Sequence, residues 1–378
     1  RHIHEIMNVY TERLAAFRAE MKAAGVAAAI VPQADPHLGE YLASHWQVRR
    51  WLSGFSGSAG DLVVTADKAA LWTDSRYFLQ AAQQLEGTGI ELMKDGLAET
   101  PTIAQWLVSL LHKQDIVGLD GMLFTNPQLK KLNDVLFRHD IGLKTDFDVI
   151  DRLWKDRPAL PDGKIFVHDE KYAGESARSK IAKVMAEAHE AGAEAVLVTA
   201  LDEIAWLLNI RCNDVKHTPV ATSYLYLRDG EGILFIDPAK LTDQTVAYLA
   251  SQGVTTRGYD EIKAFLAAGN DSEIVLVDPN TISVGLFDIV RNRFMPTAQT
   301  TASRLKSVKN ATQIAGVHKA MVRDGAALVR AFMELEDRLE KGVETTELDV
   351  ADLLHKYRSR GENYFDESFG TIAGYGPH

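Results

Sequence analysis

The sequence contains one cysteine, Cys212, among 378 residues, so no disulfide can form within one chain. It has no uninterrupted apolar run of about 18 residues, the length that a membrane-spanning helix requires. Acidic residues outnumber basic ones, and the formal net charge is -11. A general nucleic-acid-binding protein usually carries a basic face. These absences predict a protein that binds neither membranes nor nucleic acid, and the lack of disulfides is typical of the cytoplasm.

Several catalytic signatures are also missing. The sequence has no His-Glu-x-x-His zinc motif, no cysteine-based metal spacing and no Gly-x-x-x-x-Gly-Lys-Ser/Thr phosphate loop. Gly54, Gly57 and Gly60 do not have the spacing of a dinucleotide-binding fingerprint. Ser56 misses the Gly-x-Ser-x-Gly nucleophile pattern by one position. The residues alone therefore predict no complete active site.

Helical and strand-like segments alternate along the first half of the chain. Residues 9–24 have helical spacing and end at Gly25, and residues 26–31 form a short apolar strand. Residues 62–65 and 69–72 form a predicted hairpin. This alternation predicts an α/β fold with a mixed sheet flanked by helices. The stretch 154–163, which contains proline and glycine, is the best domain boundary.

The following segment repeats this order at an offset of 167 residues, the distance from Gly25 to Gly192. At this offset Ile30 falls on Leu197, and Asp35 falls on Asp202. Each copy has a helix, a glycine, an apolar strand and then a helical stretch led by aspartate, with a hairpin after it. Any two α/β units share part of this order. We nevertheless favour an internal duplication.

The last part of the chain has a different pattern. Asn310 and Gln313 form a predicted capping box at the start of a long amphipathic helix that ends at Gly342. A second helix is predicted at residues 346–360, and a strand at residues 369–372. Helix, helix and strand resemble the opening of a further domain that is not completed within these residues.

Polar residues gather at several places, and each group also has a structural interpretation. Arg49 and Arg50 either bind a carboxylate or form a solvated helix face. Asp74 is a good helix cap, with Arg76 paired to it. The densest group lies between positions 202 and 217 and comprises Asp202, Glu203, Arg211, Asp214 and His217. It is either half of a metal site or an internal salt-bridge network, and we favour the network because adjacent helical residues point apart.

His37 follows a predicted strand end, where polar side chains often line a cleft. A hydrogen bond within the loop is the simpler interpretation, and we favour it.

Longer motifs resemble a known family. These motifs are Asp-Pro-His at 35–37, Arg-Trp-Leu-Ser-Gly-Phe-Ser-Gly-Ser-Ala-Gly at 50–60, Ala-Leu-Trp-Thr-Asp-Ser-Arg-Tyr-Phe at 70–78, and the run from Val198 to Arg211. Together with Lys309-Asn310 they resemble the cytosolic-type Xaa-Pro aminopeptidases. The resemblance implies two creatinase-type N-terminal domains, residues 1–157 and 158–303. Residues 304–378 would then begin a pita-bread α+β catalytic domain.

The resemblance also implies an activity. Such metalloaminopeptidases remove the N-terminal residue from peptides whose second residue is proline, and two divalent metal ions, commonly manganese, activate a water molecule. The family's ligands are two Asp, one His and two Glu, and no residue here matches them. We therefore expect no catalytic residue and no metal ligand in this chain, which would be inactive alone. A cytoplasmic homodimer acting on proline-containing peptides is the expectation for the full-length protein.

In this family the N-terminal domains shape the entrance to the catalytic cleft. The candidates here for such a substrate rim are Arg49, Arg50, Asp74, Arg76, Arg211 and His217. Two alternatives stay open: a prolidase-like dipeptidase of the same fold, and a non-catalytic binding or assembly module of a degenerate homologue.

Overall fold

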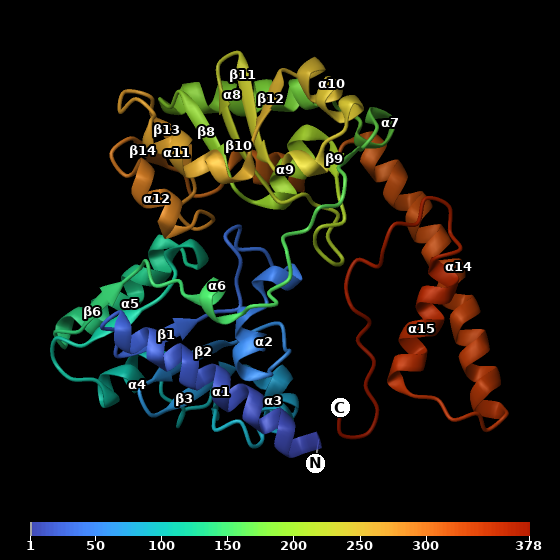
Figure 1. Cartoon of the computed structure of the whole chain (residues 1–378). Coiled ribbons are helices and arrows are strands. Elements are labelled where there is room, and N and C mark those ends of the chain that lie inside the picture. Colours follow the sequence, from blue (N-terminus) through green and yellow to red (C-terminus); the bar gives the residue numbers. More distant parts are fainter. Residues whose placement is uncertain (1) are drawn as a thin grey trace.

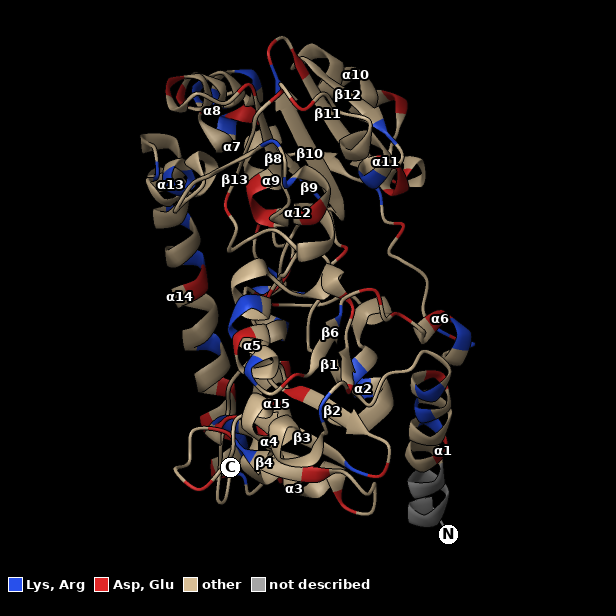
Figure 2. Ribbon diagram, turned by 90° about the vertical axis from the view of Figure 1, so that its left-hand side faces the viewer, with Lys and Arg blue, Asp and Glu red and all other residues tan. Residues whose placement is uncertain are grey.

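The computed structural model describes residues 2–378, with side chains from Val9 onward. Two α/β units are stacked on each other, and a pair of long helices lies beside them (Figure 1). Acidic and basic residues are interspersed along both units and along the long helix (Figure 2). No described helix is both long enough and apolar enough to span a bilayer.

The first unit is built on a six-stranded mixed sheet with the order β4-β3-β2-β1-β5-β6. Its strands are β1 (Ala28–Val31), β2 (Asp61–Thr65), β3 (Ala69–Thr73), β4 (Glu91–Lys94), β5 (Ile116–Gly118) and β6 (Gly142–Lys144). Its helices are α1 (His2–Ala23), α2 (Val48–Ser53), α3 (Phe78–Leu85), α4 (Ile103–Leu110), α5 (Asn126–Arg138) and α6 (Ile150–Leu153).

The second unit has a six-stranded sheet with the order β12-β11-β10-β8-β13-β14. Its strands are β8 (Ala195–Val198), β10 (Ser223–Arg228), β11 (Glu231–Ile236), β12 (Val254–Arg257), β13 (Val275–Val277) and β14 (Phe294–Pro296). A small ladder joins β7 (Phe166–Val167) and β9 (Ile210–Arg211). Its helices are α7 (Glu170–Ala173), α8 (Ala177–Ala191), α9 (Leu201–Leu208), α10 (Asp243–Ser251), α11 (Ile262–Ala267), α12 (Val284–Val290) and α13 (Thr301–Ser307).

The two sheets have the same topology, which confirms the predicted duplication. In each, the first strand pairs antiparallel with the second and parallel with the fifth. Strands β1 and β8 also occupy equivalent positions at the predicted offset of 167 residues. One prediction is wrong in the first copy: Asp35 does not lead a helix. Residues 32–43 form turns there, and the next α-helix is α2.

Each sheet has a hydrophobic core on both faces because side chains alternate along a strand. On β10, Leu225 and Leu227 pack into one core, while Tyr224 and Tyr226 pack into the other. A strand that is buried on both faces has a continuous apolar sequence. This is why the central strands could be predicted well from the sequence.

The last part of the chain holds α14 (Ala311–Glu340) and α15 (Glu347–Arg358), which pack against each other. The predicted capping box of Asn310 and Gln313 is confirmed. The Asn310 side chain also donates to the carbonyl of Ala173, at 2.8 Å, and so ties the start of α14 to α7. The strand predicted at residues 369–372 is wrong. That segment has a bend at Phe369 and no regular secondary structure, it pairs with no strand among the described residues, and Ile372 is 91% exposed.

Candidate functional site

A cleft of about 330 Å³ lies between the two domains. Residues 35–41, which follow β1, form one side, and the start of α9 with the loop around residues 215–220 forms the other. Asn280 and Thr281, which follow β13, complete it. Because β1, β8 and β13 all end at this edge, the cleft sits where strand ends of the two sheets meet. Ligand sites in α/β proteins are common at such places.

The first-domain side of the cleft is held by a tight turn. The Asp35 carboxylate accepts hydrogen bonds through Oδ1 from the backbone N–H groups of His37, at 2.9 Å, and Gly39, at 3.2 Å. Leu38 has a positive φ of 57°. A non-glycine residue adopts this conformation only where its surroundings enforce it. The turn thus fixes the residues that face the second domain.

His37 joins the two domains. Its ring lies 2.8 Å through Nδ1 from the Thr199 carbonyl and 2.6 Å through Nε2 from the Tyr259 hydroxyl. A carbonyl only accepts, so Nδ1 carries the proton and Nε2 accepts from Tyr259. Burial lowers the pKa of His37, which favours the neutral ring. The hydrogen bond within the loop that the sequence favoured is therefore wrong for the His37 ring, whose partners lie in the other domain. His37 lines the cleft instead, which was the other interpretation.

Arg49 lies in the interior of the first domain, with an exposed fraction of 0%. Its guanidinium donates to the carbonyls of Gly60, at 2.8 Å, and of Gly57. Its charge also lies over the Phe55 ring. Burial lowers its pKa to about 10. The side chain therefore pins the glycine-containing loop, while Arg50 on the same helix is exposed.

Asp74 and Arg76 lie together on the surface, after β3. The Asp74 carboxylate accepts from the Arg76 backbone N–H, which confirms the predicted cap. It also pairs with the Arg76 guanidinium at 2.9 Å. Hydrogen bonding from Arg76 lowers the pKa of Asp74. The predicted internal pairing is therefore present.

Arg211 and His217 lie in the second domain. The Arg211 guanidinium donates to the carbonyls of Ala205 and Ile210, at 2.8 Å and 3.0 Å. His217 lies beside the cleft, in edge contact with the Tyr41 ring. Its Nδ1 is 2.9 Å from the Glu367 carbonyl, so His217 also holds the last part of the chain.

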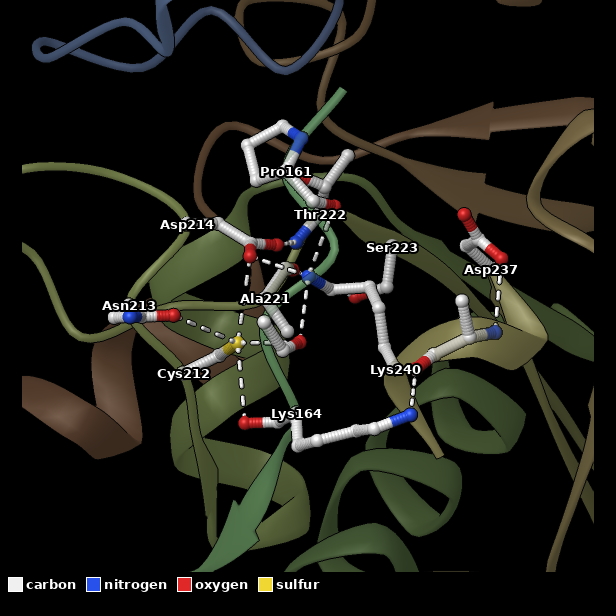
Figure 3. A network of polar contacts seen from close by, with 12 residues as sticks. Pro161, Lys164, Cys212, Asn213, Asp214, Ala221, Thr222, Ser223, Asp237 and Lys240 are labelled. Atoms are coloured by element: carbon white, nitrogen blue, oxygen red, sulfur yellow. Dashed lines mark hydrogen bonds and ion pairs between the residues drawn. The ribbon is translucent and has the colours of Figure 1, made fainter. Parts of the chain in front are cut away.

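The salt-bridge network predicted around residues 202–217 has a different composition. Asp214 pairs with Lys240, and both side chains are almost fully buried. Asp214 also accepts from the Thr222 backbone N–H, and the Cys212 thiol lies against its carboxylate (Figure 3). Sequence reasoning missed Lys240 because it comes from a distant segment. The residues around Lys240, which include Asp237 and Asp243, are those of an ordinary surface loop, so the local sequence gives no signal that this lysine is buried.

The six rim candidates are thus scattered: Arg49 is in the interior, Arg50 is exposed on α2, Asp74 and Arg76 lie on the surface after β3, Arg211 is on β9, and His217 lies beside the cleft. Among the described residues no three His, Cys, Asp or Glu side chains converge on a point where a metal ion would fit. A dinuclear site needs several such ligands. The described residues therefore do not provide the ligands of a site for two metal ions.

Two family models, both described as the creatinase/prolidase N-terminal domain, match the chain, one at residues 13–150 and the other at residues 156–313. Aminopeptidase P2 of Arabidopsis thaliana is 35% identical over 93% of this chain. A probable Xaa-Pro aminopeptidase P of Laccaria bicolor is 38% identical over 97% of it.

A solved structure is also similar. It is an X-prolyl aminopeptidase of Caenorhabditis elegans, described as a cytosolic enzyme with a di-nuclear active site. The TM-score is 0.87 at 32% identity, over 92% of this chain. The chain spans only 54% of the Arabidopsis relative, 58% of the Laccaria relative and 58% of the nematode structure.

Proposed function

This chain belongs to the creatinase/prolidase family, and we propose from that membership that it is the N-terminal part of an Xaa-Pro aminopeptidase. The enzyme would remove the first residue from peptides whose second residue is proline. The observation that carries this proposal is similarity over nearly the whole chain, in sequence and in fold, to proteins named for that activity. Similarity to isolated N-terminal domains alone would not favour one activity.

The proposed role of these residues is to shape access to the reacting peptide. The described residues supply no donor set for metal ions, so we assign them no part in activating water. We propose a dinuclear manganese site whose ligands belong to a part of the protein that this chain does not include. We also propose that the protein is cytoplasmic and forms a homodimer.

The substrate rim remains a prediction. Arg50 and the Asp74–Arg76 pair have exposed or half-exposed side chains, and these suit contact with a peptide. Arg49 is enclosed, so its proposed role is to hold the loop that follows α2. His217 lies beside the cleft and contacts the last part of the chain, which favours a role in positioning that segment. The domain boundaries after residues 157 and 303 also stay predictions, and α13 runs across the second of them.

The test is a peptide cleavage assay with two proteins: this chain, and the same chain extended by the residues that follow it in its gene. Each is incubated with Mn²⁺ and an Xaa-Pro-Xaa tripeptide. We expect release of the first residue by the extended protein and none by the 378-residue chain. An extended protein that retains metal but does not cleave Xaa-Pro peptides would contradict the proposal.

The two alternatives give different results in the same assay. A prolidase-like enzyme would cleave the Xaa-Pro dipeptide and leave the tripeptide intact. A non-catalytic module would cleave neither substrate. An Xaa-Ala-Xaa tripeptide serves as the control for proline specificity.

A further inference from the structure

The cleft between the two domains has the dimensions of a small-molecule site. Its volume of about 330 Å³ falls within the range of roughly 300–1,000 Å³ that is typical of ligand pockets. One wall is apolar: Leu201, Val215 and Val220 pack together, and the Tyr41 ring from the first domain packs against them. A ligand there would contact both domains.

The charged part of the lining is acidic. It contains three carboxylates, those of Asp35 and Glu40 from the first domain and of Asp202 from the second, and no lysine or arginine. Lys306 pairs with Asp202 at 3.1 Å and offsets one of the three charges. His37 contributes no charge when neutral, and both of its ring nitrogens already have partners. The cleft therefore favours a positively charged occupant.

Asp35 supplies an acceptor that the protein itself does not use. Its side chain is almost completely buried, at 3% exposure. Oδ1 is engaged by the turn, whereas Oδ2 has no hydrogen-bond donor among the described residues. Oδ2 is not among the buried oxygens that lack a partner, so it is accessible from the cleft and can accept from a molecule there. A cationic donor in the cleft would form a charge-assisted hydrogen bond with it.

We propose that this cleft binds an organic cation that carries an ammonium group on an apolar body, the chemistry of the amino end of a short peptide. Oδ2 of Asp35 accepts from the ammonium, and Glu40 adds to the negative potential. The apolar body lies against Leu201, Val215 and Val220, with the Tyr41 ring beside the charge. Metal ions are excluded as the occupant because no suitable ligand set converges among the described residues.

Binding in the cleft, which lies between the two N-terminal domains, needs no metal ion. Its test therefore needs no activity and uses the 378-residue chain itself. A failure of peptide cleavage would leave the cleft unaffected, and a failure of binding here would leave the proposed aminopeptidase unaffected.

The probe is L-leucinamide, with N-acetyl-L-leucinamide as its uncharged counterpart. Both are titrated into chain labelled at Leu and Val methyl groups, and the methyl signals are followed by NMR. We expect saturable shifts for Leu38, Leu201, Val215 and Val220 with L-leucinamide, while the signal of Leu62 in the first-domain core does not move. The acetylated probe should bind more weakly by a factor of about ten or more.

The variant Asp35→Asn removes the charge and keeps the turn, because the amide oxygen still accepts from His37 and Gly39. It should weaken L-leucinamide about tenfold. Asp271→Asn, an exposed acid before β13 and so at the opposite strand end from the cleft, should bind as the original chain does. If Asp35→Asn does not fold, Glu40→Gln on the exposed rim replaces it, with weaker binding again expected. Equal binding of both probes, or unchanged binding by the cleft variants, would overturn the proposal.

Discussion

The two N-terminal domains share one sheet topology but differ where their first strands end. In the second domain, α9 begins at Leu201, directly after β8. In the first, turns replace that helix, and the His37 side chain reaches Thr199 and Tyr259 of the other domain. The shared part is the hydrophobic framework, and the divergent part builds the cleft. Duplication thus preserved the core and left the connections free to change.

Two buried cations, one from each domain, are accommodated in different ways. In the first, Arg49 donates only to backbone carbonyls. In the second, Lys240 is paired with Asp214, and both are buried. The first arrangement holds a loop, whereas the second joins segments that are far apart in the sequence. Stability should respond differently in the two cases.

Replacing Lys240 should have the largest effect. Lys240→Met leaves Asp214 as a buried charge without its partner and should lower the free energy of unfolding by about 3–5 kcal/mol. Urea unfolding followed by circular dichroism measures this loss. The double variant Lys240→Met/Asp214→Leu removes both charges and should recover most of it. A loss of under about 1 kcal/mol for the single variant would show that the pair is not needed.

Gly60 tests the first-domain loop. Its φ is 135°, and an added Cβ would lie 2.4 Å from the Trp72 carbonyl oxygen, so Gly60→Ala must displace β3. We expect a loss of about 3 kcal/mol from strain and overpacking. Gly25 and Gly192 are equivalent helix ends with positive φ and no Cβ contact below 3.4 Å. Alanine at either should cost only about 1 kcal/mol, and equal losses at Gly60 and Gly25 would contradict this account.

Arg49→Met should open the same loop without moving the strand. The carbonyls of Gly57 and Gly60 lose their donor, and the free energy of unfolding should fall by about 2 kcal/mol. Limited proteolysis should then cut within residues 54–60. Arg50→Met, on the exposed neighbour, is the matched control and should change neither result. An uncut loop in Arg49→Met would show that other contacts hold it.

Lowering the pH should decrease the free energy of unfolding of both domains and weaken their junction. This effect should be smaller than those of the substitutions above. Burial lowers the pKa of His37, at the junction, and of His45, in the first domain, below the ordinary value of 6.5. For His168 of the second domain it falls to about 4. The unfolded chain therefore binds protons first as pH falls below 6.5, so stability is retained above that pH and declines below it.

The urea midpoint should accordingly decrease between pH 7 and pH 5. His37→Gln should be less stable at pH 7 but show a shallower decline, because one of the contributing groups is gone. An unchanged or steeper decline would show that His37 is not a source of the pH dependence.

The sequence predicted the framework better than the site. Apolar runs such as 195–198 mark buried strands, and Gly25 and Gly192 mark equivalent helix ends, so local patterns sufficed for both sheets. The cleft depends on contacts such as His37 with Tyr259, which are 222 positions apart. No local pattern encodes such a pairing. The strand expected at residues 369–372 failed for a related reason, because a strand forms only beside a partner.

The most direct test of the central claim is metal content. The claim is that this chain belongs to a metallopeptidase but holds none of its metal ligands. Dialysis against Mn²⁺, followed by elemental analysis, should leave no stoichiometric metal on the 378-residue chain and two ions on the chain extended by its downstream residues. Stoichiometric retention of Mn²⁺ by the 378-residue chain would contradict the account.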